Sequence, residues 1–244
     1  MTPSIYGRDR LEPTPFWSYE DLALLVSAIL PSLALAALLL RSGRAMAPRF
    51  FAGDTATTLA FQSFMYVFLL GALYLLISFR YRRPFWSSIG WTFPIPHAPR
   101  LLAMGSALAI GLSSLGVLLR APSVHSPIED MITSRASLAI VMVFGVLLAP
   151  LFEEMLFRGF LLPLLARSLG PWIGIFLTTL PFALLHGPQN AWAWQQVVLI
   201  GVAGGVFGYV RYRTGSTSAS FLLHAAYNAT GFLGFAIFRW QTLR

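Results

Sequence analysis

The sequence contains no cysteine and no lysine, and it contains few acidic residues. The absence of cysteine excludes disulfide bonds and thiolate chemistry. Only 11% of the 244 residues are charged, whereas an ordinary soluble domain has about 25%. Hydrophobic residues make up 57% of the chain. A soluble enzyme is therefore disfavoured, and each acidic residue can be considered individually.

Long charge-free stretches indicate a helical membrane protein. A helix that crosses a bilayer needs roughly 20 apolar residues, and its backbone must satisfy its own hydrogen bonds. We therefore expect an all-α fold, a polytopic transmembrane bundle of about seven or eight helices. The proline-rich stretch 84–99 is expected to be an interfacial loop. The expected spans are residues 22–40, 55–79, 101–119, 138–165, two within 168–210, and 214–238.

The formal charge of +8 comes from seventeen arginines. They are scattered at the ends of apolar runs and form no basic stripe, so nucleic acid is not an expected partner. Arginines in such positions are typical of anchors beside anionic headgroups. We expect membrane lipids to be partners of this protein.

The acidic pair Glu153-Glu154 lies inside an apolar stretch and is the only acidic sequence after Asp130. An ionisable side chain at membrane depth costs at least about 2.5 to 3.5 kcal/mol, so such a pair indicates a functional site. On a helix, Glu154 and Arg158 share a face, so the arginine can neutralise Glu154. Glu153 points about 100° away. The structural alternative is a single ion-pair cluster that holds helices together.

Two histidines strengthen the functional interpretation. His186 ends one expected span, and His224 lies inside the last span, four residues before Asn228 and on the same helical face. A single histidine on an apolar face is usually a packed core residue. Two histidines together with an amide and the glutamate pair predict a common site.

Helix geometry tests whether these groups can meet. The turn signal Gly170-Pro171 lies midway between Glu153 and His186. If both arms are helical, each residue lies about 24 Å from the turn, at the same depth. His224 and Asn228 come out shallower, so tilting or kinking must bring them to the site. The helix over 138–165 is longer than the membrane core, and we expect a break near Pro150 or Gly159.

These residues resemble the three signatures of the CAAX prenyl endopeptidase type II and bacteriocin-processing family of intramembrane proteases, also called CPBP or Abi. The resemblance covers about residues 135–232. It divides the chain into residues 1–134, a tail and three transmembrane helices with interfacial loops, and 135–238, a catalytic CPBP-like helical core. The matching motifs are Glu153-Glu154-x-x-x-Arg158, Phe182-x-x-x-His186 and His224-x-x-x-Asn228.

The resemblance implies an intramembrane endopeptidase that uses an activated water on membrane-associated or prenylated (CAAX-type) peptides or proteins. It implies that Glu153 is the general base and that His186 helps to position or deprotonate the water. His224 and Asn228 resemble the family's pair that stabilises the oxyanion. The resemblance also places the protein in a membrane, the cell membrane of a prokaryote.

Supporting roles fall to the remaining motif residues. Glu154 with Arg158 would supply electrostatic support, and Phe182 would pack beside the site. No serine adjoins either histidine in the sequence, so a serine nucleophile is disfavoured.

Two alternatives stay open at this point. Zinc held by Glu153, His186 and His224 would be a plausible catalytic set, although the His-Glu-x-x-His signature is missing and the resemblance favours catalysis without a metal. A non-catalytic membrane protein is the other alternative, either a proton-coupled carrier or an immunity or scaffold protein of the same fold. The inverted repeats typical of carriers are not found.

Overall fold

The computed structural model describes residues 15–122 and 125–239, and within these ranges the chain forms helices and no strands. The expected tail at residues 1–14 lies outside the described residues. The main helices are α1 (Tyr19–Ser27), α2 (Ile29–Met46), α3 (Asp54–Leu75), α4 (Phe85–Ser88), α5 (Ala98–Leu118), α6 (Pro127–Asp130), α7 (Arg135–Val143), α8 (Ala149–Glu154), α9 (Leu162–Leu169), α10 (Pro171–Leu185), α11 (Trp194–Thr214) and α12 (Thr217–Arg239).

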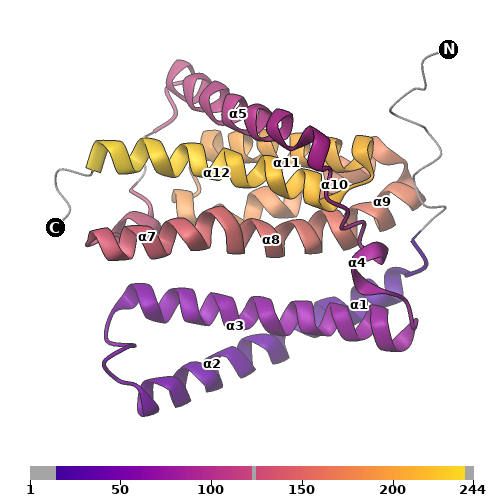
Figure 1. The fold of residues 1–244 in the computed structure, drawn as a ribbon, viewed down its shortest axis with the longest axis horizontal. Coiled ribbons are helices and arrows are strands. Elements are labelled where there is room, and N and C mark those ends of the chain that lie inside the picture. The colour runs from indigo at the N-terminus through magenta and orange to yellow at the C-terminus, as the bar shows by residue number, and fades with distance from the viewer. Residues whose placement is uncertain (1–14, 123–124, 240–244) are drawn as a thin grey trace.

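The long helices run roughly along one common direction (Figure 1). In this view the α2–α3 hairpin lies on one side of the bundle and α5 on the other, with α7 to α9 and α12 between them. The turn expected at Gly170-Pro171 is present: α9 ends at Leu169, and Gly170 has a φ of +84° before α10 begins. The α8 helix, which carries the two glutamates, lies between the α2–α3 hairpin and α5 in this view.

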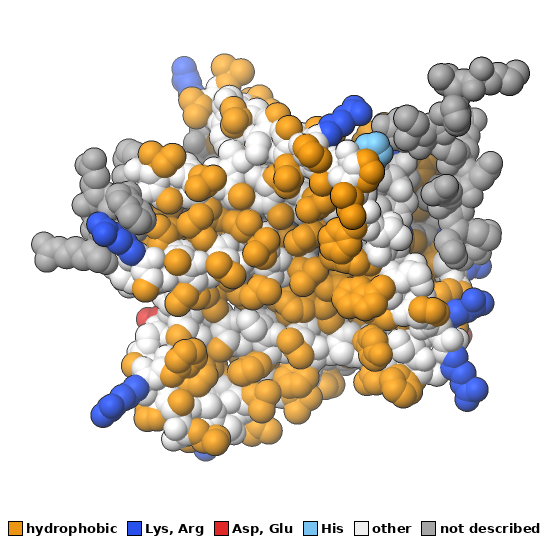
Figure 2. Space-filling view, viewed as in Figure 1, with side chains coloured by type: hydrophobic (Ala, Val, Ile, Leu, Met, Phe, Trp, Pro, Cys, Tyr) orange, Lys and Arg blue, Asp and Glu red, His pale blue; other side chains and the backbone are white. Residues whose placement is uncertain are grey.

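Four helical stretches within the described residues are long and apolar enough to cross a membrane, namely Tyr19–Met46, Asp54–Arg80, Ile95–Leu118 and Arg135–Leu169. The expected number of about seven or eight spans is not confirmed. One reason is that α10 has only 15 residues, which at 1.5 Å per residue is about 22 Å and shorter than a bilayer core. Figure 2 shows hydrophobic side chains over most of one face, with arginines towards its edges.

The helix over Arg135–Leu169 does not break near Pro150 or Gly159, and that expectation is wrong. Instead, it widens in two π-helical segments on either side of α8, η4 (Phe144–Leu148) and η5 (Met155–Leu161). A π-helical turn interrupts the usual i to i−4 bonding and so accommodates a residue such as Pro150, which has no backbone N–H. Such turns are frequently found at functional sites.

Carbonyl groups of the two π-helical segments accept hydrogen bonds from distant side chains. The indole of Trp17 donates to the Phe160 carbonyl (3.1 Å), and the Arg211 guanidinium donates to the Arg158 carbonyl (3.2 Å). The third such carbonyl belongs to Gly145. These bonds attach the segment before α1 and the end of α11 to the helix that carries the glutamates.

Before α5 begins at Ala98, the proline-rich stretch 84–99 contains only α4 and a 3₁₀ turn at Ile95–His97. It is fixed to the start of α12, because the Thr217 amide donates to the Gly90 carbonyl (2.8 Å). Gly90 has a φ of +68°, a conformation that favours glycine. The stretch thus anchors the helix that carries His224.

The α5 helix packs directly against α12, and the two backbones come closest at Gly105. A Cβ atom at Gly105 would lie 2.3 Å from the Leu223 carbonyl oxygen, next to His224 in the sequence. Thr230 on α12 also donates to Ser106 on α5 (2.9 Å). The absence of a side chain at Gly105 is therefore what allows α5 to hold α12 in place.

We predict that Gly105→Ala lowers the free energy of unfolding by about 1 to 3 kcal/mol, because the added methyl group must push α5 away from α12. Gly111→Ala on the same helix is the matched control, since a Cβ there meets nothing within 4 Å. Its stability should change by less than about 1 kcal/mol. Thermal unfolding in detergent measures both variants, and equal melting temperatures would contradict the prediction.

Candidate active site

The two glutamates occupy the last turn of α8, and the helix directs them into different surroundings. Glu154 and its partner Arg158 are fully buried, whereas the side chain of Glu153 is 14% exposed. The difference follows from the angle of about 100° between consecutive side chains on a helix.

Glu154 is bound by three side chains from two helical elements. Its Oε1 forms the expected ion pair with Arg158 Nη1 (3.0 Å) and also faces His224 Nδ1 (2.9 Å). Its Oε2 accepts a hydrogen bond from the hydroxyl of Ser220 (2.6 Å). Both carboxylate oxygens are therefore engaged, which is what a buried charge requires.

Arg158 connects this carboxylate to α11. Its Nη2 donates to the Gly204 carbonyl (2.8 Å), and the guanidinium carbon lies 4.4 Å from the centre of the Phe182 ring. A guanidinium over an aromatic face gains a cation–π attraction. A Cβ atom at Gly204 would lie 3.3 Å from Nη2. The glycine-rich face of α11 thus leaves space for the buried arginine.

Glu153 has looser contacts than Glu154. Its Oε1 accepts a hydrogen bond from the hydroxyl of Tyr66 on α3 (3.3 Å), and its Oε2 lies 3.9 Å from His224 Nε2. The second distance is too long for a hydrogen bond. No contact joins Glu153 to the Arg158 side chain among the hydrogen bonds and ion pairs of the described residues, as the helical spacing predicts.

His224 bridges the two glutamates and is held in a defined orientation. An ionised carboxylate only accepts hydrogen bonds, so the Nδ1 atom facing Glu154 carries the hydrogen of that bond. The imidazole stacks on Phe207, with ring centres 4.3 Å apart. Nε2 is therefore turned towards Glu153. The expectation of a His224–Asn228 pair did not include this contact with both glutamates.

His186 and Phe182 lie on the other side of this cluster. The Phe182 ring contacts both imidazoles, with centres 4.7 Å from His186 and 5.9 Å from His224. His186 Nδ1 bonds to the Phe182 carbonyl (2.7 Å), which leaves Nε2 as the nitrogen available for other contacts. No hydrogen bond or ion pair joins His186 to Glu153 within the described ranges. The histidine beside Glu153 is His224.

Asn228 lies one turn after His224 and faces a π-helical segment. Its side-chain amide donates to the Gly145 carbonyl in η4 (2.7 Å). An amide nitrogen has two N–H donors, so this bond orients the side chain and leaves one donor. Phe182 thus contacts both histidines and His224 faces both glutamates, whereas the Asn228 side chain is bound to η4.

Comparison with known proteins matches part of the chain to a family. Residues 135–230 match the family described as type II CAAX prenyl endopeptidase Rce1-like. This segment is Rce1-like. It contains all three motifs, and the resemblance seen in the sequence is confirmed. Together with the apolar helices, the Rce1-like segment indicates an integral membrane protein.

The chain is also similar to an uncharacterized 24.3 kDa protein of Escherichia coli. The two are 29% identical over 155 residues, which cover 59% of this chain and 70% of that protein. No solved structure matches the chain.

The possible zinc set does not assemble in the Rce1-like segment. Across the described residues, no group of three histidine, aspartate or glutamate side chains is arranged to hold a metal ion. Glu153 and His224 face each other, but no contact among the described residues brings the available Nε2 of His186 to this pair. The described residues therefore do not fit a three-ligand zinc site.

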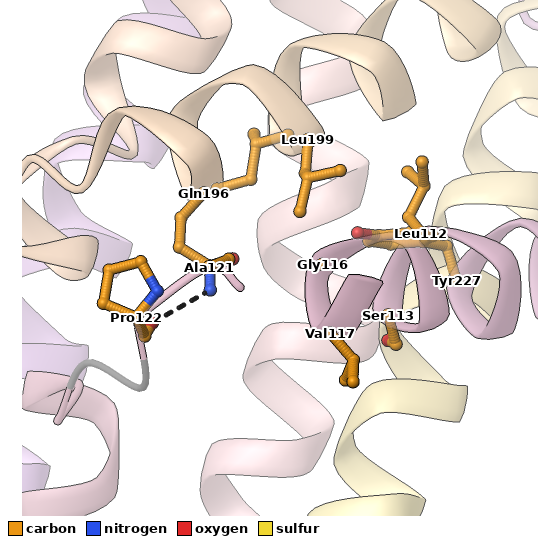
Figure 3. A pocket seen from close by; sticks show the side chains of 10 residues that line it. Leu112, Ser113, Gly116, Val117, Ala121, Pro122, Gln196, Leu199 and Tyr227 are labelled. Atoms are coloured by element: carbon orange, nitrogen blue, oxygen red, sulfur yellow. Dashed lines mark hydrogen bonds between the residues drawn. The ribbon is translucent and has the colours of Figure 1, made fainter. Parts of the chain in front are cut away.

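A cavity of about 300 Å³ lies beside the Rce1-like site, between α5, α11 and α12. Figure 3 shows the hydroxyl of Tyr227 pointing into it, towards Leu199 and Gln196. The Tyr227 ring packs against Phe207 (5.8 Å between centres), which in turn stacks on His224. Two aromatic rings, those of Tyr227 and Phe207, thus separate the cavity from the imidazole.

Sequence reasoning missed two polar partners of the glutamates. Ser220 lies four residues before His224 and so shares its helical face, a spacing that could have identified it. Tyr66 lies in α3, outside the Rce1-like segment, and only the pairing of Gln62 and Tyr66 on one face of an apolar helix signals it. The serine binds a carboxylate and is fully buried, so it acts as a structural donor.

We predict that Ser220→Ala destabilises the protein by about 1 to 3 kcal/mol, because it leaves one oxygen of the buried Glu154 carboxylate without its donor. Ser114→Ala is the matched control, since Ser114 is exposed and bonds only within its own helix. Chemical or thermal unfolding in detergent gives the difference. A Ser220→Ala variant as stable as the control would show that this hydrogen bond is dispensable.

Proposed function

We propose that this protein is an intramembrane endopeptidase that cleaves membrane-associated or prenylated, CAAX-type, substrates with a water activated by glutamate. The observation that carries the proposal is the difference between the contacts of the two adjacent glutamates. Both carboxylate oxygens of Glu154 are bound by protein groups. Oε2 of Glu153, which faces His224 Nε2, accepts no hydrogen bond from the described residues. A structural ion-pair cluster accounts for Glu154 and leaves Glu153 unexplained.

The proposed reaction follows from this geometry. The Glu153 carboxylate takes a proton from water as the water oxygen bonds to the carbonyl carbon of the peptide. The tetrahedral intermediate then collapses, the C–N bond breaks, and the proton passes from Glu153 to the leaving nitrogen. The 3.9 Å separation of Glu153 Oε2 and His224 Nε2 supports a reacting group held by both side chains.

Charge that develops on the carbonyl oxygen needs donors. We propose His224 and Asn228 for this role: the Asn228 amide keeps a second N–H, and His224 donates from Nε2 when its imidazole carries a hydrogen on both nitrogens. His186 is proposed to position the water through its Nε2. Glu154 binds the Nδ1 side of the His224 imidazole. The positive charge of Arg158 neutralises the Glu154 carboxylate.

The proposed partners are membrane lipids and a peptide or protein substrate at the membrane, and the proposed location is the cell membrane of a prokaryote. The cavity between α5, α11 and α12 supports a substrate with an apolar group, because Leu112, Leu199 and Ile200 line it and its lining residue Tyr227 packs against Phe207. Val117, which also lines the cavity, is exposed. An apolar group could therefore enter from the lipid side.

We predict that Glu153→Gln and Glu153→Ala reduce the cleavage rate by about 10² to 10⁴-fold, the usual contribution of a general base. The assay uses purified protein in detergent with a prenylated CAAX-type peptide, the same peptide without its prenyl group, and an unrelated apolar peptide. Asp54→Asn is the control, because Asp54 is an exposed acid at the start of α3. Cleavage by Glu153→Ala at the rate of Asp54→Asn would overturn the proposal.

The same preparation tests the zinc alternative. We expect cleavage to persist after chelation and to be unrelated to the metal content of the protein. Loss of activity on chelation that zinc restores would instead assign a metal to the site. The prenylated and unprenylated peptides separate the substrate classes, since a preference for the prenyl group requires that the group itself is bound.

A further inference from the structure

Tyr66 and Gln62 extend the site beyond the Rce1-like segment. Both residues lie on α3, one helical turn apart, and Tyr66 contacts Phe152 and Glu153 on α8. The Gln62 amide donates to the Tyr66 hydroxyl (2.9 Å), and this hydroxyl donates to Glu153 Oε1 (3.3 Å). A continuous hydrogen-bond chain therefore runs from α3 to the glutamate.

The Tyr66 ring is fixed by packing. It stacks on Phe144 in η4, with centres 6.3 Å apart, and lies 4.8 Å from the ring of Phe152 in α8. Only 8% of the residue is exposed. Aromatic neighbours on both the π-helical segment and α8 thus set where the hydroxyl points, independently of the hydrogen bonds.

The direction of the chain determines which carboxylate oxygen is held. A phenol has one hydrogen, and because Gln62 occupies an acceptor position on the hydroxyl, that hydrogen is left for Glu153. The bond is to Oε1. Oε2, which faces His224 Nε2 at 3.9 Å, receives no hydrogen bond within the described residues. One oxygen is anchored and the other is left for chemistry.

We propose that Tyr66, oriented by Gln62, is a positioning residue that anchors Oε1 of Glu153 and so directs Oε2 towards the reacting groups. The inference rests on the proposed function, since it assigns the support of the same general base. It also gives the α3 helix a part in the reaction. The charged and titratable groups around Glu153 are Tyr66 on α3, Glu154 and Arg158 on its own helix, and His224 on α12.

We predict that Tyr66→Phe lowers kcat about tenfold and leaves KM within about twofold, because it removes a donor to the ionised carboxylate and keeps the ring packing. The acidic limb of the kcat–pH profile should move to higher pH for the same reason. Gln62→Leu should produce the same changes to a smaller extent. Tyr74→Phe is the matched control, because Tyr74 is half-exposed on the same helix and its hydroxyl forms no hydrogen bond with the described residues.

Thermal unfolding of each variant separates positioning from a structural role. A structural role would lower the melting temperature and the active fraction without moving the pH limb. If Tyr66→Phe and Gln62→Leu both keep the kcat and pH profile of Tyr74→Phe, the inference is overturned while loss of cleavage in Glu153→Gln still supports the proposed function. If Glu153→Gln itself cleaves normally, the proposed function fails first.

Discussion

The buried ion pair between Glu154 and Arg158 is the contact on which the site depends. Neither charge could be buried alone without a large cost in free energy, and each draws in further partners from other helices. Ser220 and His224 bring α12 to the carboxylate, and the Gly204 carbonyl brings α11 to the guanidinium. The orientation of His224 is thereby fixed before any substrate arrives.

This arrangement gives two neighbouring carboxylates different environments. Glu154 is enclosed by donors, whereas Glu153 meets Tyr66 on one oxygen and faces His224 with the other. The π-helical segments on both sides of α8 bind further side chains around the glutamates' helix. The Gly145 carbonyl orients Asn228, and the Arg158 carbonyl binds Arg211. A widened helix thus offers backbone acceptors to side chains from distant parts of the chain.

Local spacing predicts much of this structure. The Gly170-Pro171 turn, the helical class and the Glu154–Arg158 pair follow from signals within a few residues. The π-helical widening around α8 does not follow from such signals. A proline predicts that a helix is irregular, but not whether the irregularity is a break, a kink or a π-helical segment. The contacts of His224 with both glutamates and of Tyr66 with Glu153 join residues about 70 and 90 positions apart, and only the packed bundle determines them.

Replacement of each glutamate in turn, with cleavage and melting temperature measured on the same samples, tests the central claim most directly. Glutamine keeps the shape and removes the charge. The account predicts that Glu153→Gln loses cleavage and keeps its melting temperature, whereas Glu154→Gln loses both, because it breaks the ion pair with Arg158. A Glu153→Gln variant that still cleaves, or one that unfolds as readily as Glu154→Gln, would contradict the separation of the two roles.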